Sequence, residues 1–278
     1  MRKKLKLRNG EYYHFDNMKI MGIINITPNS FFAGSRRMNV EDAVEQARKM
    51  KADGADILDI GGESTRPGVD PVAPEEEIER IVPVIEAIKK EMDILISVDT
   101  YHSETAEAAL LAGADIINDV TGLRGDPNMA KICAKYDAPI IIMHMKKDPK
   151  TMQKDIHYDD FMGEVYDYFK DQIDFAIQEG NDPERLILDP GVGLPKSFDN
   201  NIEIIQKLET FYDFDLPILL AVSRKTFIGK ILGGTPPEDR LEGTIAISCW
   251  AAERGIEMIR VHDVKENCNA IRVMEALK

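Results

Sequence analysis

Short apolar runs alternate along this chain with amphipathic segments of helical period, and this alternation limits the possible folds more than any other feature. The runs are rich in Ile, Leu and Val at consecutive positions, which is typical of parallel strands buried on both faces. They lie at 20–26, 57–60, 94–98, 116–120, 140–143, 186–188, 218–222 and 258–261. The helical segments lie at 39–53, 74–91, 103–112, 127–136, 158–179, 198–212, 240–254 and 264–277.

Eight strand and helix units in this order predict an α/β fold, a (β/α)8 TIM barrel. An open doubly wound sheet is the alternative. A chain of 278 residues suits one barrel, and its apolar residues are spread evenly with no low-complexity linker. We therefore expect a short N-terminal β cap over 1–17 and a single barrel domain over 18–278.

Composition excludes several classes of protein. The net charge of -14 argues against non-specific nucleic-acid binding, which needs a cationic surface. No apolar run reaches the roughly 18 residues of a membrane span, and the basic start of the chain leads into polar residues, so we expect no signal peptide and a cytoplasmic protein. Cys133, Cys249 and Cys268 show no paired spacing, which argues against disulfides and zinc.

Polar residues follow almost every predicted strand. Active-site residues of such barrels lie at the C-terminal ends of the strands, so these residues are expected to share one rim. A barrel without a site there would need few of them. They are Asn25, the stretch 61–66, Asp99, Asn118, Asp119, His144, Asp189, the stretch 223–225, Arg260 and His262.

Three of these residues are short and rigid hydrogen-bonding groups. Asp99, Asn118 and Asp189 combine two carboxylates with one carboxamide. The acids accept hydrogen bonds and the amide both donates and accepts, which suits a flat heterocycle that carries amino, ring N–H and carbonyl groups. Each residue alone could equally be a helix cap or a turn residue. Together they predict a binding site for a polar ring.

Other rim residues suit an anion. Asn25 could supply one oxygen ligand to a Mg²⁺ ion that also binds substrate phosphate, or it could only hydrogen-bond the strand end. Arg260 and His262 alternate on the last strand and share a face, where they form a plausible anion clamp. Lys225 could reach a ring atom and Thr226 a second anionic group; the alternative for these two residues is a solvated basic turn.

The stretch 56–68 passes from an apolar strand into a loop rich in glycine, hydroxyl groups and charge. Gly61 and Gly62 permit a sharp turn. Thr65 and Arg66 offer donors for an anion or a polar ring, and Pro67 stiffens the exit. An ordinary strand-to-helix loop is the alternative. The chain contains no Walker phosphate loop, no Gly-x-Gly-x-x-Gly fingerprint and no Ser-His-Asp arrangement.

Taken together in chain order, these motifs resemble the dihydropteroate synthases, from about residue 18 to the end. The second and seventh loops are specific to that family, whereas the Asp and Asn rim is shared with other pterin-binding barrels. The motifs are MGIINITP at 21–28, GGESTRPG at 61–68, SVDT at 97–100, IND at 117–119, LDPG at 188–191, SRK at 223–225, RLEGT at 240–244 and RVHD at 260–263.

The resemblance implies condensation of 6-hydroxymethyl-7,8-dihydropterin pyrophosphate with p-aminobenzoate, with Mg²⁺ as cofactor and a homodimer formed through the last helices. Lys225, Arg260, Asp99 and Asp189 would be the catalytic residues. Asp99, Asn118, Asp189 and Lys225 would hold the pterin, and Asn25 would bind Mg²⁺. Thr65, Arg260 and His262 would hold the diphosphate, and Pro67 and Thr226 would form the aminobenzoate site with the first and second loops. Arg66 and Met143 would be further substrate-binding residues.

The chain departs from the family pattern at three positions on the aminobenzoate side. Asn29 and Ala33 stand where the first loop usually carries acids, and Leu194 stands where a Phe is frequent. We therefore expect normal pterin binding, with altered cation stabilisation, second-substrate affinity or sulfonamide sensitivity. The alternatives are a pterin-binding homologue with weak or lost synthase activity, and a methyltransferase that acts between methyltetrahydrofolate and a corrinoid.

Overall fold

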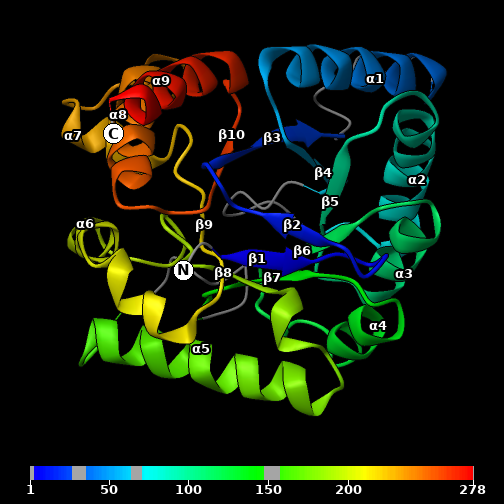
Figure 1. The fold of residues 1–278 in the computed structure, drawn as a ribbon, viewed down its shortest axis with the longest axis horizontal. Coiled ribbons are helices and arrows are strands. Elements are labelled where there is room, and N and C mark those ends of the chain that lie inside the picture. Colours follow the sequence, from blue (N-terminus) through cyan, green and yellow to red (C-terminus); the bar gives the residue numbers. More distant parts are fainter. Residues whose placement is uncertain (1–2, 27–35, 64–70, 147–156, 278) are drawn as a thin grey trace.

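The computed structural model describes residues 3–26, 36–63, 71–146 and 157–277 (Figure 1). The strands are β1 (Lys4–Lys6), β2 (Tyr12–His14), β3 (Lys19–Asn25), β4 (Ile57–Gly61), β5 (Leu95–Asp99), β6 (Ile116–Asp119), β7 (Ile140–Met143), β8 (Leu186–Asp189), β9 (Leu219–Leu220) and β10 (Met258–Val261). The α-helices are α1 (Arg36–Asp53), α2 (Pro74–Glu91), α3 (Ser103–Leu111), α4 (Met129–Lys135), α5 (Phe161–Gln178), α6 (Phe198–Gln206), α7 (Thr226–Ile231), α8 (Leu241–Glu253) and α9 (Val264–Ala276). Short 3-10 helices are η1 (Pro183–Arg185), η2 (Leu208–Phe214) and η3 (Pro237–Asp239).

The strands form an 8-stranded parallel sheet in the order β8-β7-β6-β5-β4-β3-β10-β9. A parallel bridge between Leu188 and Ile218 joins the two ends, and the Leu188 amide donates to the Pro217 carbonyl over 2.9 Å. The order therefore runs around a ring with no reversal. The TIM-barrel prediction is confirmed, and the alternative of an open doubly wound sheet is wrong.

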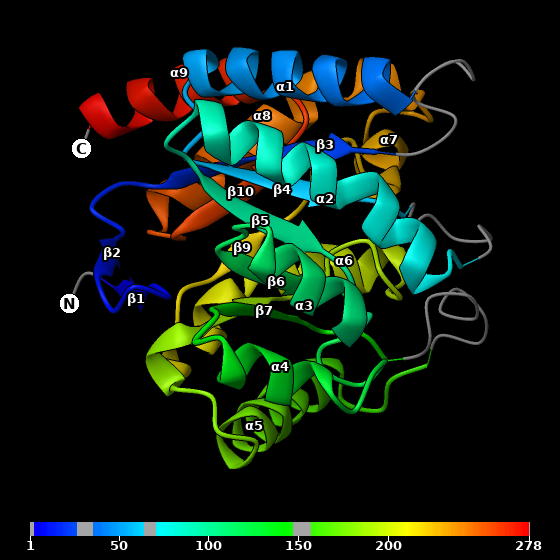
Figure 2. The same cartoon turned by 90° about the vertical axis from the view of Figure 1, so that its right-hand side faces the viewer.

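The N-terminal hairpin of β1 and β2 lies at the end of the barrel where the parallel strands begin (Figure 2). Leu5 and Phe15 are buried there against the apolar residues of the barrel interior. The predicted β cap is therefore present and closes this end of the barrel, which we call the lower end. The upper rim is the opposite end, where the parallel strands stop. The domain boundary at residue 17 stays a prediction.

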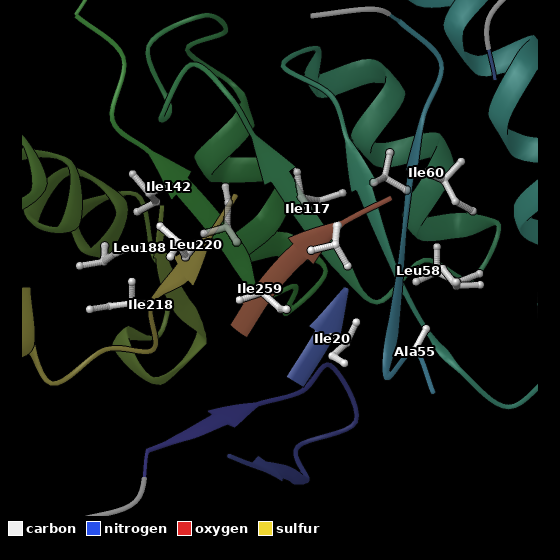
Figure 3. Packing of buried hydrophobic residues seen from close by; sticks show 14 of the residues in the cluster. Ile20, Ala55, Leu58, Ile60, Ile117, Ile142, Leu188, Ile218, Leu220 and Ile259 are labelled. Atoms are coloured by element: carbon white, nitrogen blue, oxygen red, sulfur yellow. The ribbon is translucent and has the colours of Figure 1, made fainter. Parts of the chain in front are cut away.

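Alternate residues of each strand face opposite sides of the barrel wall. The outward side chains pack under the helices in one large cluster, part of which is drawn in Figure 3. The inward side chains form a smaller cluster that fills the lower half of the barrel. Its inward strand residues are Met21, Ile57, Ile116, Ile141, Ile187, Leu219 and Met258.

Residues two positions apart on a strand point to the same face. On five of these strands, the inward residue two positions after the apolar one belongs to a different set of side chains. Ile57 is followed in this way by Asp59, and Ile116 by Asn118. The other three inward positions are Met143, Asp189 and Arg260. On these five strands, the barrel interior thus changes from apolar to largely polar at the next inward position.

Two local predictions were wrong. The segment 198–212 is not one helix, because α6 ends at Gln206 and the chain continues as η2. The helix α7 was not predicted, since its six residues are too few to display a helical period and Gly233 and Gly234 follow it closely. Among the described residues, no helix is both long and apolar enough to cross a membrane.

Candidate active site

The three residues expected to bind a polar ring lie together at the upper rim. Asp99, Asn118 and Asp189 end or nearly end β5, β6 and β8, and all three are buried. Within the described residues, Oδ1 of Asp99 and Oδ1 of Asn118 are buried without a hydrogen-bond partner. Oδ1 of Asp189 accepts a hydrogen bond of 2.8 Å from the Gly191 amide. Because buried polar atoms are normally paired, the two unpartnered oxygens indicate a ligand with donors.

Arg260 reaches across the rim from β10 and binds two carboxylates. Its Nη2 donates to Oδ2 of Asp99 over 2.7 Å, and its Nε donates to Oδ2 of Asp59 over 2.5 Å. Sequence reasoning missed Asp59, because it looked for polar groups only after the strands and Asp59 lies within the apolar run 57–60. The signal was present, since a charged residue inside a buried strand is rare unless it is paired.

Burial and neighbouring charges both shift the pKa values of the carboxylates at the rim. Burial raises the pKa of Asp99 to about 7; Arg260 opposes this rise and Asp59 adds to it. Burial likewise raises the pKa of Asp189, whereas the Gly191 amide and Lys225 act in the opposite direction. The carboxylates therefore lie in a region of low polarity where hydrogen bonds to a ring gain strength.

Lys225 lies beside the loop that follows β8. Its Nζ donates to the Val192 carbonyl over 2.7 Å, and burial lowers its pKa to about 8, a shift that the nearby Asp189 opposes. Gly193 allows this approach: its φ is +82°, and a Cβ there would lie 2.6 Å from Cδ of Lys225. Lys225 thus shares the rim with Asp189, as predicted.

The turn between β9 and α7 is held by its neighbours. Arg224 has a left-handed φ of 57°, and its guanidinium binds both oxygens of Asp263 at 2.8 and 2.5 Å. The Ser223 hydroxyl lies 2.9 Å from Nδ1 of His262, which is exposed. Thr226 is exposed at the start of α7. The structure therefore brings the ends of β9 and β10 together, with His262 and Thr226 open to solvent.

Met143 lies in a small apolar cluster at the same end of the barrel. It packs with Val120 and Met145, and the partly buried Tyr101 and Leu194 contact this cluster. In register, Met143 pairs with Asp189. The rim therefore has an apolar portion beside its acids, as a flat ring requires, and Leu194 belongs to that portion.

Two further rim residues prove to be structural. Asp119 accepts hydrogen bonds from the Thr121 amide at 2.7 Å and the Leu123 amide at 2.9 Å, so it holds the turn after β6. His144 is buried, and its Nδ1 lies 2.9 Å from Nζ of Lys196. Neither side chain is offered to a ligand in this arrangement.

The structure also limits how a metal could be held. Among the described residues, no group of three His, Cys, Asp or Glu could bind an ion. Asn25 ends β3 beside Gly61 and is exposed. One amide oxygen fits Mg²⁺, which keeps water and phosphate as its other ligands, and does not fit an ion that needs a full protein shell.

Several predicted residues lie outside the described residues. They are Thr65, Arg66 and Pro67 of the second loop and Asn29 and Ala33 of the first. Their predicted roles stay predictions.

Comparison of the sequence with known proteins identifies the family of this chain. The profile of the pterin binding enzyme family matches residues 21–262. A dihydropteroate synthase from Synechocystis sp. is 43% identical over 258 residues, which cover 93% of this chain and 89% of that protein. The dihydropteroate synthase of Escherichia coli K12 is 44% identical over 257 residues, which cover 92% of this chain and 90% of the relative.

Solved structures of dihydropteroate synthases share the fold. The Clostridium difficile protein, crystallised in the presence of pteroic acid, superposes with a TM-score of 0.88 at 46% identity, covering 94% of this chain and 97% of that one. The Xanthomonas albilineans protein with 4-aminobenzoic acid gives 0.92 at 39% identity, covering 100% of this chain and 98% of that one. By sequence and by fold, this chain belongs to the pterin-binding enzymes and, within them, to the dihydropteroate synthases.

Proposed function

We propose that this chain condenses 6-hydroxymethyl-7,8-dihydropterin pyrophosphate with p-aminobenzoate to give 7,8-dihydropteroate and pyrophosphate. The observation that carries the proposal is the pair of buried and unpartnered acceptors, Oδ1 of Asp99 and Oδ1 of Asn118, beside Asp189 and Lys225. A pterin ring supplies the amino and ring N–H donors that these oxygens lack. The curated relatives carry the same activity in their names.

The reaction exchanges one bond for another. The C–O bond between the pterin methylene and the diphosphate breaks, and pyrophosphate leaves with the electron pair. The amine nitrogen of p-aminobenzoate forms a C–N bond to that methylene and loses one proton. The chain binds and orients both substrates, and the positive charge of Arg260 beside Asp99 favours the departing anion.

We propose that Asn25 would hold Mg²⁺. When bound, the ion would neutralise charge on the leaving group. The support for this proposal is the donor chemistry, since Asn25 ends β3 at the rim and its amide oxygen suits Mg²⁺. His262 and Arg260, which alternate on β10 and its exit, would complete the diphosphate site.

The aminobenzoate side is assigned by similarity and by position. Thr226 is exposed beside Lys225, and Leu194 lies in the apolar cluster with Met143. A relative from Xanthomonas albilineans has been solved with 4-aminobenzoic acid, and one from Yersinia pestis with a sulfonamide drug. We propose that p-aminobenzoate and sulfonamides bind at this side of the rim, where Pro67 of the second loop would also contact them.

Two broader properties are proposed on less direct grounds. A homodimer through the last helices is supported by Val273 and Leu277, which are exposed and four residues apart on or just after α9. Light scattering on the purified protein would test it. A cytoplasmic location is also proposed, and fractionation of cells that express the protein would test it.

Pyrophosphate release by the purified protein is the direct test. We expect release and dihydropteroate formation only when the pterin pyrophosphate, p-aminobenzoate and Mg²⁺ are all present. Asp189→Asn should lower kcat/KM by about 100-fold, since a buried acceptor of ring donors is lost. Asp182→Asn is the matched control, because Asp182 precedes the same strand at the opposite end of the barrel.

The same assay separates the rival functions. Pterin binding without product would identify a binding homologue that has lost synthase activity. Methyl transfer from methyltetrahydrofolate to a corrinoid would identify the methyltransferase. Either result would overturn the proposed reaction while leaving the family assignment intact.

A further inference from the structure

Asp59 contacts two residues of the upper rim, Arg260 and Asn118, although it lies deeper in the barrel than the rim. It is fully buried on β4, where it pairs in register with Ser97 of β5 and Ile23 of β3. Gly61, the next inward residue of β4, pairs with Asp99. Asp59 is therefore one inward position deeper than the residues expected to touch the pterin.

One oxygen of Asp59 receives two donors from different strands. Its Oδ2 accepts from Nε of Arg260 on β10 at 2.5 Å and from Nδ2 of Asn118 on β6 at 3.2 Å. The strands β3 and β5 lie between these partners and β4. The contact thus spans five neighbouring strands through side chains of alternate strands, which is how inward layers of such barrels are built.

Both partners of Asp59 have a second role at the rim. Arg260 also donates from Nη2 to Oδ2 of Asp99 over 2.7 Å, so two carboxylates hold two different nitrogens of one planar guanidinium. Asn118 donates to Asp59 and keeps its Oδ1 unpartnered among the described residues. The amide orientation that offers Oδ1 to a ligand is therefore set by Asp59.

We propose that Asp59 is a positioning residue for the condensation: one buried carboxylate fixes both the Arg260 guanidinium and the Asn118 amide. Its other oxygen, Oδ1, is buried and has no hydrogen-bond partner among the described residues. Through Oδ2, Asp59 acts by way of Arg260 on the diphosphate side and by way of Asn118 on the pterin side, so it sets the distance between the leaving group and the held ring. This role rests on the proposed function.

The charge of Asp59 also acts on Asp99. Both carboxylates share Arg260, and the negative charge of Asp59 is one cause of the raised pKa of Asp99. Glu77 and Asp119 act in the same direction, and Arg260 opposes them. Removal of the Asp59 charge should therefore lower the pKa at which Asp99 ionises.

The test compares Asp59→Asn with Ser97→Ala. Asparagine keeps the shape of the side chain but loses the charge that Arg260 binds. Ser97 is the register neighbour of Asp59, and its buried hydroxyl has no partner among the described residues, so Ser97→Ala changes the same layer without touching Arg260. Thermal unfolding of both variants checks that the barrel is intact.

We expect Asp59→Asn to lower kcat by about 10- to 100-fold, which is less than the roughly 100- to 1,000-fold lost when a group that itself stabilises the transition state is removed. The KM for p-aminobenzoate should change less than threefold. The acidic limb of the kcat/KM profile should move to lower pH, a shift that a merely structural role would not produce. Ser97→Ala should retain wild-type kinetics within about twofold.

A double-mutant cycle with Arg260→Lys locates the effect. If Asp59 acts through Arg260, the loss in the double variant should be smaller than the product of the two single losses. Independent losses, or an Asp59→Asn enzyme with unchanged kcat and unchanged pH profile, would overturn the proposal. If the wild type releases no pyrophosphate, the proposed reaction fails by itself. Asp59 is then tested by titration with the pterin pyrophosphate, where equal Kd values for wild type and Asp59→Asn would reject its role.

Discussion

Nζ of Lys196 lies 2.9 Å from Nδ1 of His144, and both side chains are buried. The same Nζ donates to the carbonyls of Gly191 and Leu194 at 2.9 and 2.8 Å. Nζ thus has three polar contacts, and burial lowers the pKa values of both Lys196 and His144. Lys196 ties the loop after β8, which carries Val192 and Gly193, to the end of β7.

Lys196→Met should destabilise the protein by about 2–4 kcal/mol, since two carbonyls and one imidazole nitrogen lose their buried donor while the cost of burying an ammonium disappears. Urea unfolding monitored by circular dichroism measures this change. Lys207→Met, on the surface, is the control and should change stability by less than about 0.5 kcal/mol. Equal midpoints for the two variants would show that Lys196 does not hold the loop.

Gly193→Ala should impair pterin binding beyond its effect on stability. The new Cβ would lie 2.6 Å from Cδ of Lys225, so the lysine must move away from the Val192 carbonyl. Gly234→Ala is the matched control: its φ of +98° is equally unfavourable for alanine, but no atom lies within 4 Å. Both variants should lose about 1 kcal/mol of stability from backbone strain.

Only Gly193→Ala should raise the Kd for the pterin pyrophosphate, by about 10-fold, which is about 1.4 kcal/mol. Isothermal titration of both variants measures this difference. A similar Kd for the two variants would mean that the position of Lys225 is unimportant for pterin binding.

The pH dependence of kcat/KM should report Asp99 and Lys225 in the free enzyme. Burial raises the pKa of Asp99 to about 7 and lowers that of Lys225 to about 8. Binding that requires an ionised Asp99 and a protonated Lys225 is therefore best between about pH 7 and 8. Lys225→Arg should remove the alkaline limb, because a guanidinium stays protonated there. An alkaline limb that persists unchanged in this variant would assign it to another group.

The same shifts affect stability with a definite sign. Asp99 binds its proton more tightly in the folded state than in the unfolded state, so its contribution to stability falls as the pH rises from about 4 to about 7. Lys225 binds its proton more weakly in the folded state, so its contribution rises between about pH 8 and 10.5. Asp99→Asn should flatten the first change in urea unfolding curves recorded across that range.

Two of the positions at which the chain departs from the family pattern, Ala33 and Leu194, can be tested by substitution. Ala33→Asp should raise kcat and Leu194→Phe should lower the KM for p-aminobenzoate, each by about 3- to 10-fold, if the departures weaken cation stabilisation and second-substrate binding. Leu194→Met, of similar volume, controls for repacking against Val120 and Met143. An unchanged rate in Ala33→Asp would reject the first-loop hypothesis.

The strands could be predicted from the local sequence alone. Most inward and outward residues of a buried parallel strand are apolar, so each strand forms a continuous apolar run in the sequence. The rim residues Asp99, Asn118 and Asp189 could be predicted because each ends or nearly ends such a run and barrel topology brings strand ends together. The helix α7 could not be predicted, because its six residues make fewer than two helical turns. The break after α6 could not be predicted either, because the buried Leu208 and Phe211 of η2 continue the apolar spacing of a helix.

The sequence by itself determined the barrel, the polar residues of its rim and the family. Only the tertiary structure decided which polar residues meet. Asp59 and Arg260 are 201 residues apart, and their contact depends on the closure of the ring through β10 and β3. His144 and Asp119 follow their strands as the rim acids do, yet they bind Lys196 and backbone amides. Sequence pattern places a residue on a strand, whereas its partner depends on which side chains cross the barrel interior.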